Sequence, residues 1–398
     1  MGALSWVRVD GTKKPVGWSL RKMRMRRRRQ YHLKMSRLSL LIFAGLLACA
    51  APRPEDAALS QGFATRSAAL SEPGGFFDTD NLISNERSYL HAIDDIEALG
   101  IHGGAYLGVG PDQNFSYIAA IEPEVAYLID IRRDNLLLHL LYKALFELAA
   151  TRVEYLALLF GREPPAAVEA WRDADITALV RYLDEANSNA AIVARTRVVT
   201  DSSIATFGVL LDSTDWATID RFHLTFIRSG LSLTFKTFGR PPRAFYPTYR
   251  DLLAERDRGG RQVNYLASPH RYRVVRELQL RHAVIPVVGD VAGSHALSAI
   301  AEEMQARGIE LSVFYISNVE FYLFREGTFD AFAANLERLP RLRESVIVRS
   351  VFDRGGPEGF TSRDGVVYYS RQQVRSTGDL LNAHAAGSLR TYSALVGR

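Results

Sequence analysis

Glycines and acidic residues stand where apolar runs of this chain end, a pattern that can build a nucleoside pocket. Gly108 and Gly110 follow the apolar run at residues 105–107, and Asp130 closes the next run at residues 125–129. Glycines allow a ligand to approach the backbone, and an acid at the end of the second strand can accept hydrogen bonds from both hydroxyls of a ribose. These three residues therefore predict a pocket for a small molecule that contains a nucleoside.

Polar residues follow two further apolar runs in the same way. Gly289 and Asp290 come after the third run, and Asn318 and Glu320 come after the fourth. The carboxyl ends of parallel strands meet at one edge of a sheet, where ligands bind in open α/β folds, so these groups are expected to converge on one crevice. The simpler alternative is that the aspartates cap the following helices and the glycines serve tight turns.

The elements that must position these residues alternate between strand and helix. An apolar strand, a glycine turn, a short helix, a second strand, an acid and the helical block 136–150 make up a βαβ unit. Continuous apolar runs indicate strands that are covered on both faces. The sequence therefore predicts an α/β fold with a mostly parallel, doubly wound sheet; the other expected elements are strands at 284–288, 312–316, 346–351 and 366–369 and helices at 85–99, 294–307 and 321–339.

Residues 151–283 interrupt this rhythm. They contain helical stretches at 166–186 and 216–228 and a segment rich in proline and aromatic residues at 239–249. We interpret them as a helical or mixed insertion that covers the ligand edge of the sheet. The whole α/β domain is expected to span residues 63–398, after a flexible tether at 50–62 in which proline, charged and small residues mix.

The first 49 residues have the composition of an export leader. A run of Lys and Arg precedes the uncharged residues 38–48, which are too few for a membrane span of roughly 20 residues and suit a signal-peptide core. Cys49, the only cysteine, follows directly and resembles the lipobox of bacterial lipoproteins; the alternative is an ordinary signal peptide, and Met35 offers a second start. We expect an exported protein of the periplasm or cell envelope, with a membrane contact only through a lipid on Cys49.

The charge distribution argues against a nucleic-acid partner. The chain carries a net charge of +5 at pH 7, but its basic residues are concentrated in the leader, and residues 50–398 have an excess of acids. Binding to phosphate backbones needs basic charge on the folded surface. The apolar fraction of 47% is typical of a globular chain. A small molecule is therefore the expected ligand.

Several common chemistries have no motif in this sequence. The chain has no GxSxG, HExxH or GxxxxGK[ST] motif and no cysteine pair, and no metal site is expected. Gln113 stands where a dinucleotide fingerprint has its third glycine, which argues against NAD or FAD and less against a ligand without phosphates. His139 lies in an apolar helical block and is expected in the core. Arg132 and Arg133 are expected at a solvated helix start, with binding of an acidic substrate as the alternative.

The glycines and acids at the ends of the apolar runs resemble the class I S-adenosylmethionine-dependent methyltransferases. The resemblance implies that Gly108 and Gly110 hold the methionine part of the cofactor, that Asp130 holds its ribose, and that Asp290, next to Gly289, contacts the adenine amine. It also implies that Asn318 and Glu320 face the methyl acceptor. The acid that often precedes the glycines in that family is missing, since Tyr106 and Leu107 occupy its place.

A more specific resemblance covers most of the chain after the leader. The segments GVGPDQNFSYIA, DIRRDNLLLHLL, IPVVGDVAG and YISNVEFYLF, together with residues 81–86 and 265–268, look like a family of uncharacterised bacterial proteins with a methyltransferase-like, Rossmann-like fold. The resemblance implies this fold and no particular activity.

Three functions stay open from the sequence. The first is methyl transfer from S-adenosylmethionine to an acceptor of unknown identity, by in-line attack on the sulfonium methyl with Asn318 or Glu320 orienting or deprotonating the acceptor. The second is an exported ligand-binding or interaction protein without turnover, which the leader favours because S-adenosylmethionine is made in the cytoplasm. The third is an enzyme that uses another nucleoside-containing cofactor, and the missing third glycine counts against it.

Overall fold

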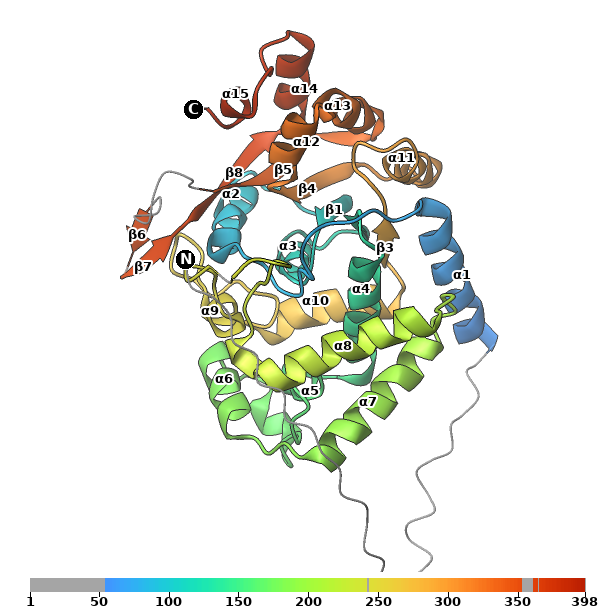
Figure 1. Cartoon of the computed structure of the whole chain (residues 1–398), viewed down its shortest axis with the longest axis vertical. Helices are drawn as coiled ribbons and strands as arrows, with labels where there is room; N and C mark the ends of the chain where they lie inside the picture. Colours follow the sequence, from blue (N-terminus) through green and yellow to red (C-terminus); the bar gives the residue numbers. More distant parts are fainter. Residues whose placement is uncertain (1–53, 242, 353–360, 364, 398) are drawn as a thin grey trace, which may run out of the picture. The chain divides into compact units, whose positions relative to one another are not determined.

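A six-stranded sheet forms the centre of the fold, and five of its strands are the continuous apolar runs (Figure 1). The parallel strands stand in the order β3-β2-β1-β4-β5, and β8 pairs with β5 in the antiparallel direction. Every residue of β1 and β3 is buried, as expected for strands that helices cover on both faces. The predicted α/β class with a mostly parallel sheet is thus confirmed; the strands are β1 (Ala105–Val109), β2 (Val125–Asp130), β3 (Val284–Val288), β4 (Leu311–Ser317), β5 (Arg341–Phe352) and β8 (Ser370–Ser376).

This computed structural model describes residues 54–241, 243–352, 361–363 and 365–397. The expected leader at residues 1–49, with Cys49, lies outside the described residues. Helix α1 (Pro54–Leu70) occupies most of the segment expected as a tether, and Phe63 on this helix is buried. No helix among the described residues is both long and apolar enough to cross a membrane.

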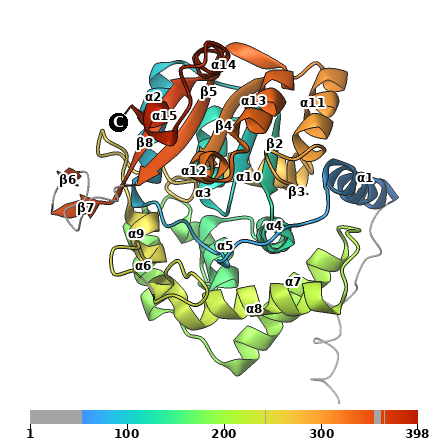
Figure 2. The ribbon, with the colours of Figure 1, turned by 45° about the horizontal axis from the view of Figure 1, so that its top comes forward.

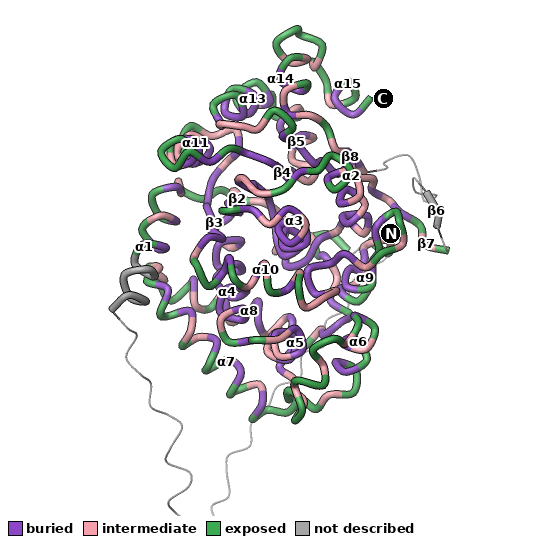
Figure 3. The backbone as a smooth tube through the Cα atoms, turned by 180° about the vertical axis from the view of Figure 1, so that it is seen from behind, coloured by how far each residue is buried: buried purple, intermediate pink, exposed green. Residues whose placement is uncertain are grey.

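Two helical layers cover the sheet (Figure 2). In one layer, α3 contacts α2 and α10, and α10 also contacts α4. In the other layer, α13 contacts α11, α12 and α14. Buried residues are concentrated in the strands and in α3 (Figure 3). The helices of the two layers are α2 (Ile93–Ala98), α3 (Gln113–Ile121), α4 (Arg133–Leu148), α10 (Pro269–Leu280), α11 (Ala296–Arg307), α12 (Val319–Glu326), α13 (Phe329–Arg338) and α14 (Thr377–Ala385), and α15 (Tyr392–Val396) ends the fold.

The insertion between β2 and β3 is largely helical. Thr151, Asp212 and Thr248 each close a capping box at a helix start, which fixes where three of these helices begin. Helices α7 and α8 pack against α4, so the insertion rests on the βαβ unit. Its elements are α5 (Arg152–Leu159), η2 (Val168–Trp171), α6 (Ile176–Glu185), α7 (Ala190–Ala205), α8 (Ser213–Ser229), η3 (Gly230–Ser232) and α9 (Tyr249–Ala254).

Four expected elements differ in the structure. The helical stretch expected at 166–186 is divided into a 3-10 turn, η2 (Val168–Trp171), and the helix α6 (Ile176–Glu185). The strand expected at 366–369 is β7 (Val366–Tyr368), which pairs with β6 (Thr361–Arg363) in a separate hairpin and not with the main sheet. The helix expected at 321–339 is divided between α12 and α13, because Gly327 ends α12 in a left-handed conformation. The helix expected at 85–99 is a 3-10 turn, η1 (Arg87–Ala92), followed by α2.

Residues 71–86 form a strap that crosses the carboxyl ends of the strands. Its backbone donates hydrogen bonds to the carbonyls of Val288 at the end of β3 and of Ile131 after β2. Arg221 on α8 bonds to Asp80 of the strap, which passes between the sheet and α8 (Figure 2). Pro73 and two following glycines disfavour a helix in this segment. The strap therefore covers the edge of the sheet where the predicted site residues stand.

Candidate functional site

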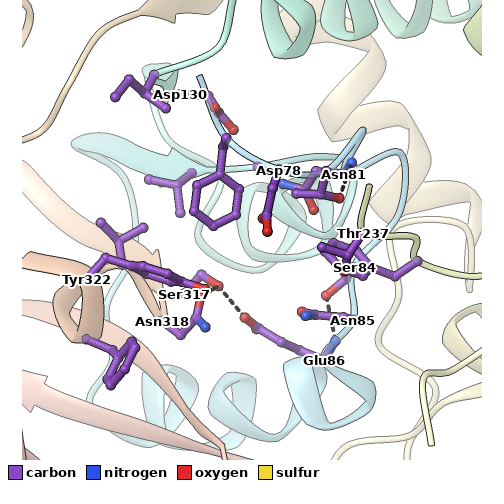
Figure 4. A pocket seen from close by; sticks show the side chains of 18 of the residues that line it. Asp78, Asn81, Ser84, Asn85, Glu86, Asp130, Thr237, Ser317, Asn318 and Tyr322 are labelled. Carbon is purple, nitrogen blue, oxygen red and sulfur yellow. Dashed lines mark hydrogen bonds between the residues drawn. The ribbon is translucent and has the colours of Figure 1, made fainter. Parts of the chain in front are cut away.

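A cavity of about 1060 Å³ lies at the carboxyl ends of β1 to β4. The strap and α12 form two walls of the cavity (Figure 4). Residues 235–241 and 243–246 of the insertion, together with Phe352 and Tyr369, complete it. Strand β1 pairs with β2 on one side and with β4 on the other, so the cavity lies where the strand order reverses direction. This is the place where open α/β sheets bind their ligands.

Five of the seven predicted site residues line this cavity. Gly110, Asp130, Gly289, Asp290 and Asn318 are brought together there from four different strand ends. The two others, Gly108 and Glu320, are not among its lining residues.

Gly108 is needed for packing within the sheet layer. A Cβ atom at this position would lie 1.9 Å from Oδ1 of Asn114 and 2.7 Å from the ring of Tyr106. The Asn114 side chain in turn donates hydrogen bonds to the carbonyls of Val109, Gly110 and Pro111. Gly108 thus lets α3 approach β1 closely, and its neighbour Asn114 fixes the shape of the turn that leads to the cavity.

Gly110 has a backbone conformation that favours glycine. Its φ is +85°, and a Cβ atom would meet Nε2 of Gln113 at 3.1 Å and Nδ2 of Asn81 at 3.3 Å. The Gly110 carbonyl lies 2.9 Å from Nε2 of His139, which is buried within α4. Burial lowers the pKa of His139 to about 4. His139 is therefore a neutral core residue that supports the glycine turn.

Asp130 lines the cavity and is bound to Arg132. Nε of Arg132 donates to Oδ1 at 3.1 Å and Nη2 donates to Oδ2 at 2.9 Å, while the Arg132 amide donates to Oδ1 at 2.9 Å. Arg132 was expected at a solvated helix start, but it is buried, because its Nη1 also donates to the strap carbonyls of Thr79 and Asp80. Arg133, in contrast, is exposed and pairs with Asp215.

Gly289 and Asp290 follow β3 as predicted. A Cβ atom at Gly289 would lie 2.2 Å from Cβ of Ala296, so this glycine lets α11 start close to the strand. The Asp290 amide donates to Glu72 of the strap, and its Oδ1 accepts from the amide of Ala292. The other carboxylate oxygen of Asp290, which lines the cavity, makes no hydrogen bond to the described residues.

Glu320 does not reach the cavity, although it lies two residues from Asn318. Its two oxygens accept hydrogen bonds from Nε and Nη2 of Arg349 at 2.6 and 3.0 Å, and both side chains are buried. The pair links α12 to β5. A carboxylate held by a buried arginine is a structural group in this position and has no access to an acceptor in the cavity.

Glu86 lines the cavity, although its sequence pattern does not predict this position. It lines the cavity at the end of the strap, and only 1% of its surface is exposed. The hydroxyl of Tyr315 donates to it at 2.5 Å, and the hydroxyls of Ser317 and Ser350 donate as well. Burial raises the pKa of the Glu86 carboxyl, and these hydroxyls oppose that shift. The available signal in the sequence was an acid at the end of residues 81–86, which are otherwise apolar, amide or hydroxyl residues.

Two residues of the cavity wall have left-handed backbone conformations without being glycine. Asn81 has φ of +49° and Ser317 has φ of +54°. Such conformations cost of order 1–2 kcal/mol for residues with a Cβ atom. At Ser317, where the pairing of β4 with β5 is irregular, the turn directs the hydroxyl toward Glu86 (Figure 4).

Asp112 lies behind the glycine turn, at the start of α3. It is buried and accepts hydrogen bonds from the hydroxyls of Tyr249 at 2.7 Å and Tyr265 at 3.2 Å. Burial raises the pKa of Asp112 to about 6. This acid caps no amide of α3 with its side chain. Its charge disfavours a phosphate at the helix start, where dinucleotides place their pyrophosphate.

Aromatic side chains form the outer part of the cavity. Phe77 of the strap contacts Tyr322 of α12 edge to face, with ring centroids 5.1 Å apart. Phe245 of the insertion stacks on Tyr369 at 4.4 Å. Phe76, which also lines the cavity, is 80% exposed. The insertion 151–283, which was predicted to cover the ligand edge, thus contributes Phe235, Phe245 and Tyr246 to an aromatic wall of the cavity.

The family comparison returns a match over most of the folded chain. A family model described as "Domain of unknown function (DUF7790)" matches residues 82–198 and 218–396. These ranges include all strands of the main sheet and the five predicted residues that line the cavity, together with Glu86. No curated protein matches the chain.

Proposed function

The chain belongs to the family described as domain of unknown function DUF7790, and on that premise we propose that its cavity binds S-adenosylmethionine for methyl transfer to an acceptor. The observation that carries the proposal is the convergence of Gly110, Asp130, Asp290 and Asn318 on one cavity at the reversal point of the sheet. These are the residues that the methyltransferase resemblance assigns to the methionine part, the ribose, the adenine amine and the acceptor.

The size and the polarity of the cavity support this choice of ligand. Ligand pockets usually measure roughly 300–1,000 Å³, so about 1060 Å³ leaves room for a nucleoside cofactor and a second small molecule. The acid Asp112 at the start of α3 and the absent third glycine both act against a pyrophosphate. A nucleoside without phosphates suits these features better than NAD or FAD.

The acids of the cavity have free acceptor positions for such a ligand. A carboxylate offers about four lone-pair sites, and Arg132 occupies two on Oδ1 and one on Oδ2 of Asp130. One position on Asp130 is left for a ribose hydroxyl, fewer than the two expected from the sequence. The free oxygen of Asp290 is available to the adenine amine.

Asn318 is the polar residue after β4 that faces the acceptor space. When bound, S-adenosylmethionine supplies a methyl group on a positively charged sulfur. Asn318 can orient an acceptor by donating or accepting a hydrogen bond, and rate enhancement then comes mainly from positioning. Glu320 has no part in this proposal because Arg349 holds it away from the cavity.

A second candidate function is ligand binding without turnover. The ion pair of Glu320 with Arg349 favours binding without turnover, because the base expected after β4 is not available to an acceptor. Export, with a lipid on Cys49, remains part of both proposals.

Calorimetric titration of the full chain with S-adenosylmethionine, S-adenosylhomocysteine and NAD tests the proposal. We expect both adenosyl compounds to bind and NAD to bind more weakly. A folded protein that binds neither adenosyl compound refutes the proposal. Release of S-adenosylhomocysteine after addition of a small-molecule extract distinguishes turnover from binding alone.

A further inference from the structure

We propose that Glu86 receives a primary ammonium group of the ligand, which in S-adenosylmethionine is the α-ammonium of the methionine part. This inference rests on the proposed function and deepens it, because it assigns the recognition of one end of the cofactor to a residue of the strap. It also states a selection rule: the cavity prefers ligands that carry a cationic amine at this position.

The hydrogen bonds of Glu86 leave one acceptor position open. Oε2 accepts from Tyr315 and Ser350, and Oε1 accepts from Ser317. Of about four lone-pair sites on a carboxylate, these three hydroxyls leave one on Oε1 open, and Gln372 is a further neutral partner of the group. Three neutral hydroxyls hold the group in place from β4 and β5.

The charge of Glu86 is not balanced by the protein in the part of the chain that the structure describes. The other buried acid near the end of β4, Glu320, pairs with Arg349, and Asp130 pairs with Arg132. Its partners are three hydroxyls and the neutral amide of Gln372, and none of them carries a charge. A buried carboxylate without a cation is costly, and a cationic group of a ligand would remove much of that cost.

The surroundings of Glu86 offer a second acceptor to an ammonium group. Gln113 lines the same cavity and is buried, and its Oε1 has no hydrogen-bond partner among the described residues. The Tyr315 hydroxyl lies between the two side chains, 2.5 Å from Glu86 and 3.5 Å from Nε2 of Gln113. An ammonium has three donors and no acceptor, so it fits a carboxylate and an amide oxygen together.

The position of Glu86 agrees with the proposed orientation of the cofactor. Glu86, Ser317 and Asn318 lie around one space in the cavity (Figure 4). Gly110, which the resemblance assigns to the methionine part, lies next to Gln113 in the same wall. An acid supplied by the strap thus stands in for the acid that Tyr106 and Leu107 replace before the glycines.

The experiment compares S-adenosylhomocysteine with its deaminated analogue, in which hydrogen replaces the α-amino group. Calorimetry with the full wild-type chain should give about tenfold or more tighter binding of S-adenosylhomocysteine, the value of one charge-assisted hydrogen bond. Glu86→Gln should remove most of this preference and leave the affinity for the analogue unchanged. The matched control is Glu320→Gln, an equally buried acid outside the cavity, which should lower the melting temperature and keep the preference.

Each outcome decides between the inference and the function on which it rests. No binding of either compound to the wild type refutes the proposed function. Equal binding of both to the wild type, or an equal loss of both in Glu86→Gln, overturns the assignment of Glu86 while the proposed function stands. If Glu86→Gln does not fold, Glu86→Asp replaces it; the shorter acid should reduce the preference severalfold, and an unchanged preference contradicts the proposal.

Discussion

Arg132 holds Asp130 through three hydrogen bonds, so the acid at the end of β2 is ordered before any ligand arrives. The same guanidinium donates to the carbonyls of Thr79 and Asp80 and thereby fixes the strap over the cavity. One arginine thus connects an acid that lines the cavity to the strap that forms one of its walls. Preorganised polar groups of this kind reduce the ordering cost of binding.

Asp130→Ala is expected to weaken binding of S-adenosylhomocysteine about tenfold, because one charge-assisted hydrogen bond to the ribose is lost. The variant should also lose about 2–3 kcal/mol of unfolding free energy, since the buried Arg132 is left without its acid. Calorimetry and urea denaturation measure the two effects. Asp215→Ala, which removes the partner of the neighbouring Arg133, is the control and should leave the affinity unchanged. Equal affinity in Asp130→Ala and wild type would discard Asp130 as a ligand residue.

The strands of the sheet could be predicted because each is a short, continuous apolar run. The runs at 284–288 and 125–129 agree with β3 and β2 almost to the residue. Strand β8 escaped prediction because it lies at the sheet edge and is polar, with Gln372, Gln373 and Arg375 among its residues. Edge strands are exposed on one side and need no apolar run.

The strand ends of the site could be predicted from topology, and the strap could not. Parallel strands bring their carboxyl ends together, which placed Gly110, Asp130 and Asp290 in one cavity. The burial of Arg132 and Glu86 depends on contacts with residues far away in the sequence, such as Ser350. Charged residues are rarely buried unless they have partners. When the partners are far away in the sequence, the local sequence pattern therefore assigns such residues to the surface.

Gly108→Ala and Gly110→Ala should separate packing from ligand contact. The methyl group at position 108 overlaps Asn114, so this variant should be strongly destabilised or fail to fold. At position 110 the strain of φ +85° should cost about 1–2 kcal/mol, and the methyl group should displace Gln113 or Asn81 and weaken ligand binding. Gly308→Ala, with φ of +64° and open space, reports the backbone cost alone. A Gly110→Ala protein with full affinity would contradict the role of this turn.

Cys49→Ser should abolish membrane association if Cys49 carries a lipid. Fractionation of cells that express the wild type or the variant, followed by mass spectrometry of the mature N-terminus, measures this. Wild-type protein found with an intact leader in the cytoplasm would remove the export proposal.

His139 should make the fold sensitive to acid. Burial lowers its pKa to about 4 from an ordinary 6.5, so the unfolded chain binds a proton that the folded chain excludes between these values. The free energy of unfolding should therefore fall as the pH falls from about 6.5 toward 4, by roughly 3 kcal/mol in total. His139→Gln retains a donor to the Gly110 carbonyl and should lose this component. Urea denaturation at pH 7.5 and 4.5 measures this component. An identical change in the free energy of unfolding between the two pH values for wild type and variant would count against it.

Asp112 should act in the same pH range with the opposite sign. Burial raises its pKa to about 6 from an ordinary 3.8, so the folded chain holds a proton that the unfolded chain has lost between these values. The contribution of Asp112 to stability is thus complete below pH 4 and is lost as the pH rises through 6, again by roughly 2–3 kcal/mol. Asp112→Asn keeps one acceptor for Tyr249 and Tyr265 and should remove this loss. The two groups flank the same glycine turn, and their effects on the pH dependence of stability offset each other in the wild type. The double variant of Asp112→Asn and His139→Gln should therefore have a pH profile of unfolding free energy close to that of the wild type. The two single variants should deviate from this profile in opposite directions, and deviations of the same sign would refute the assignment.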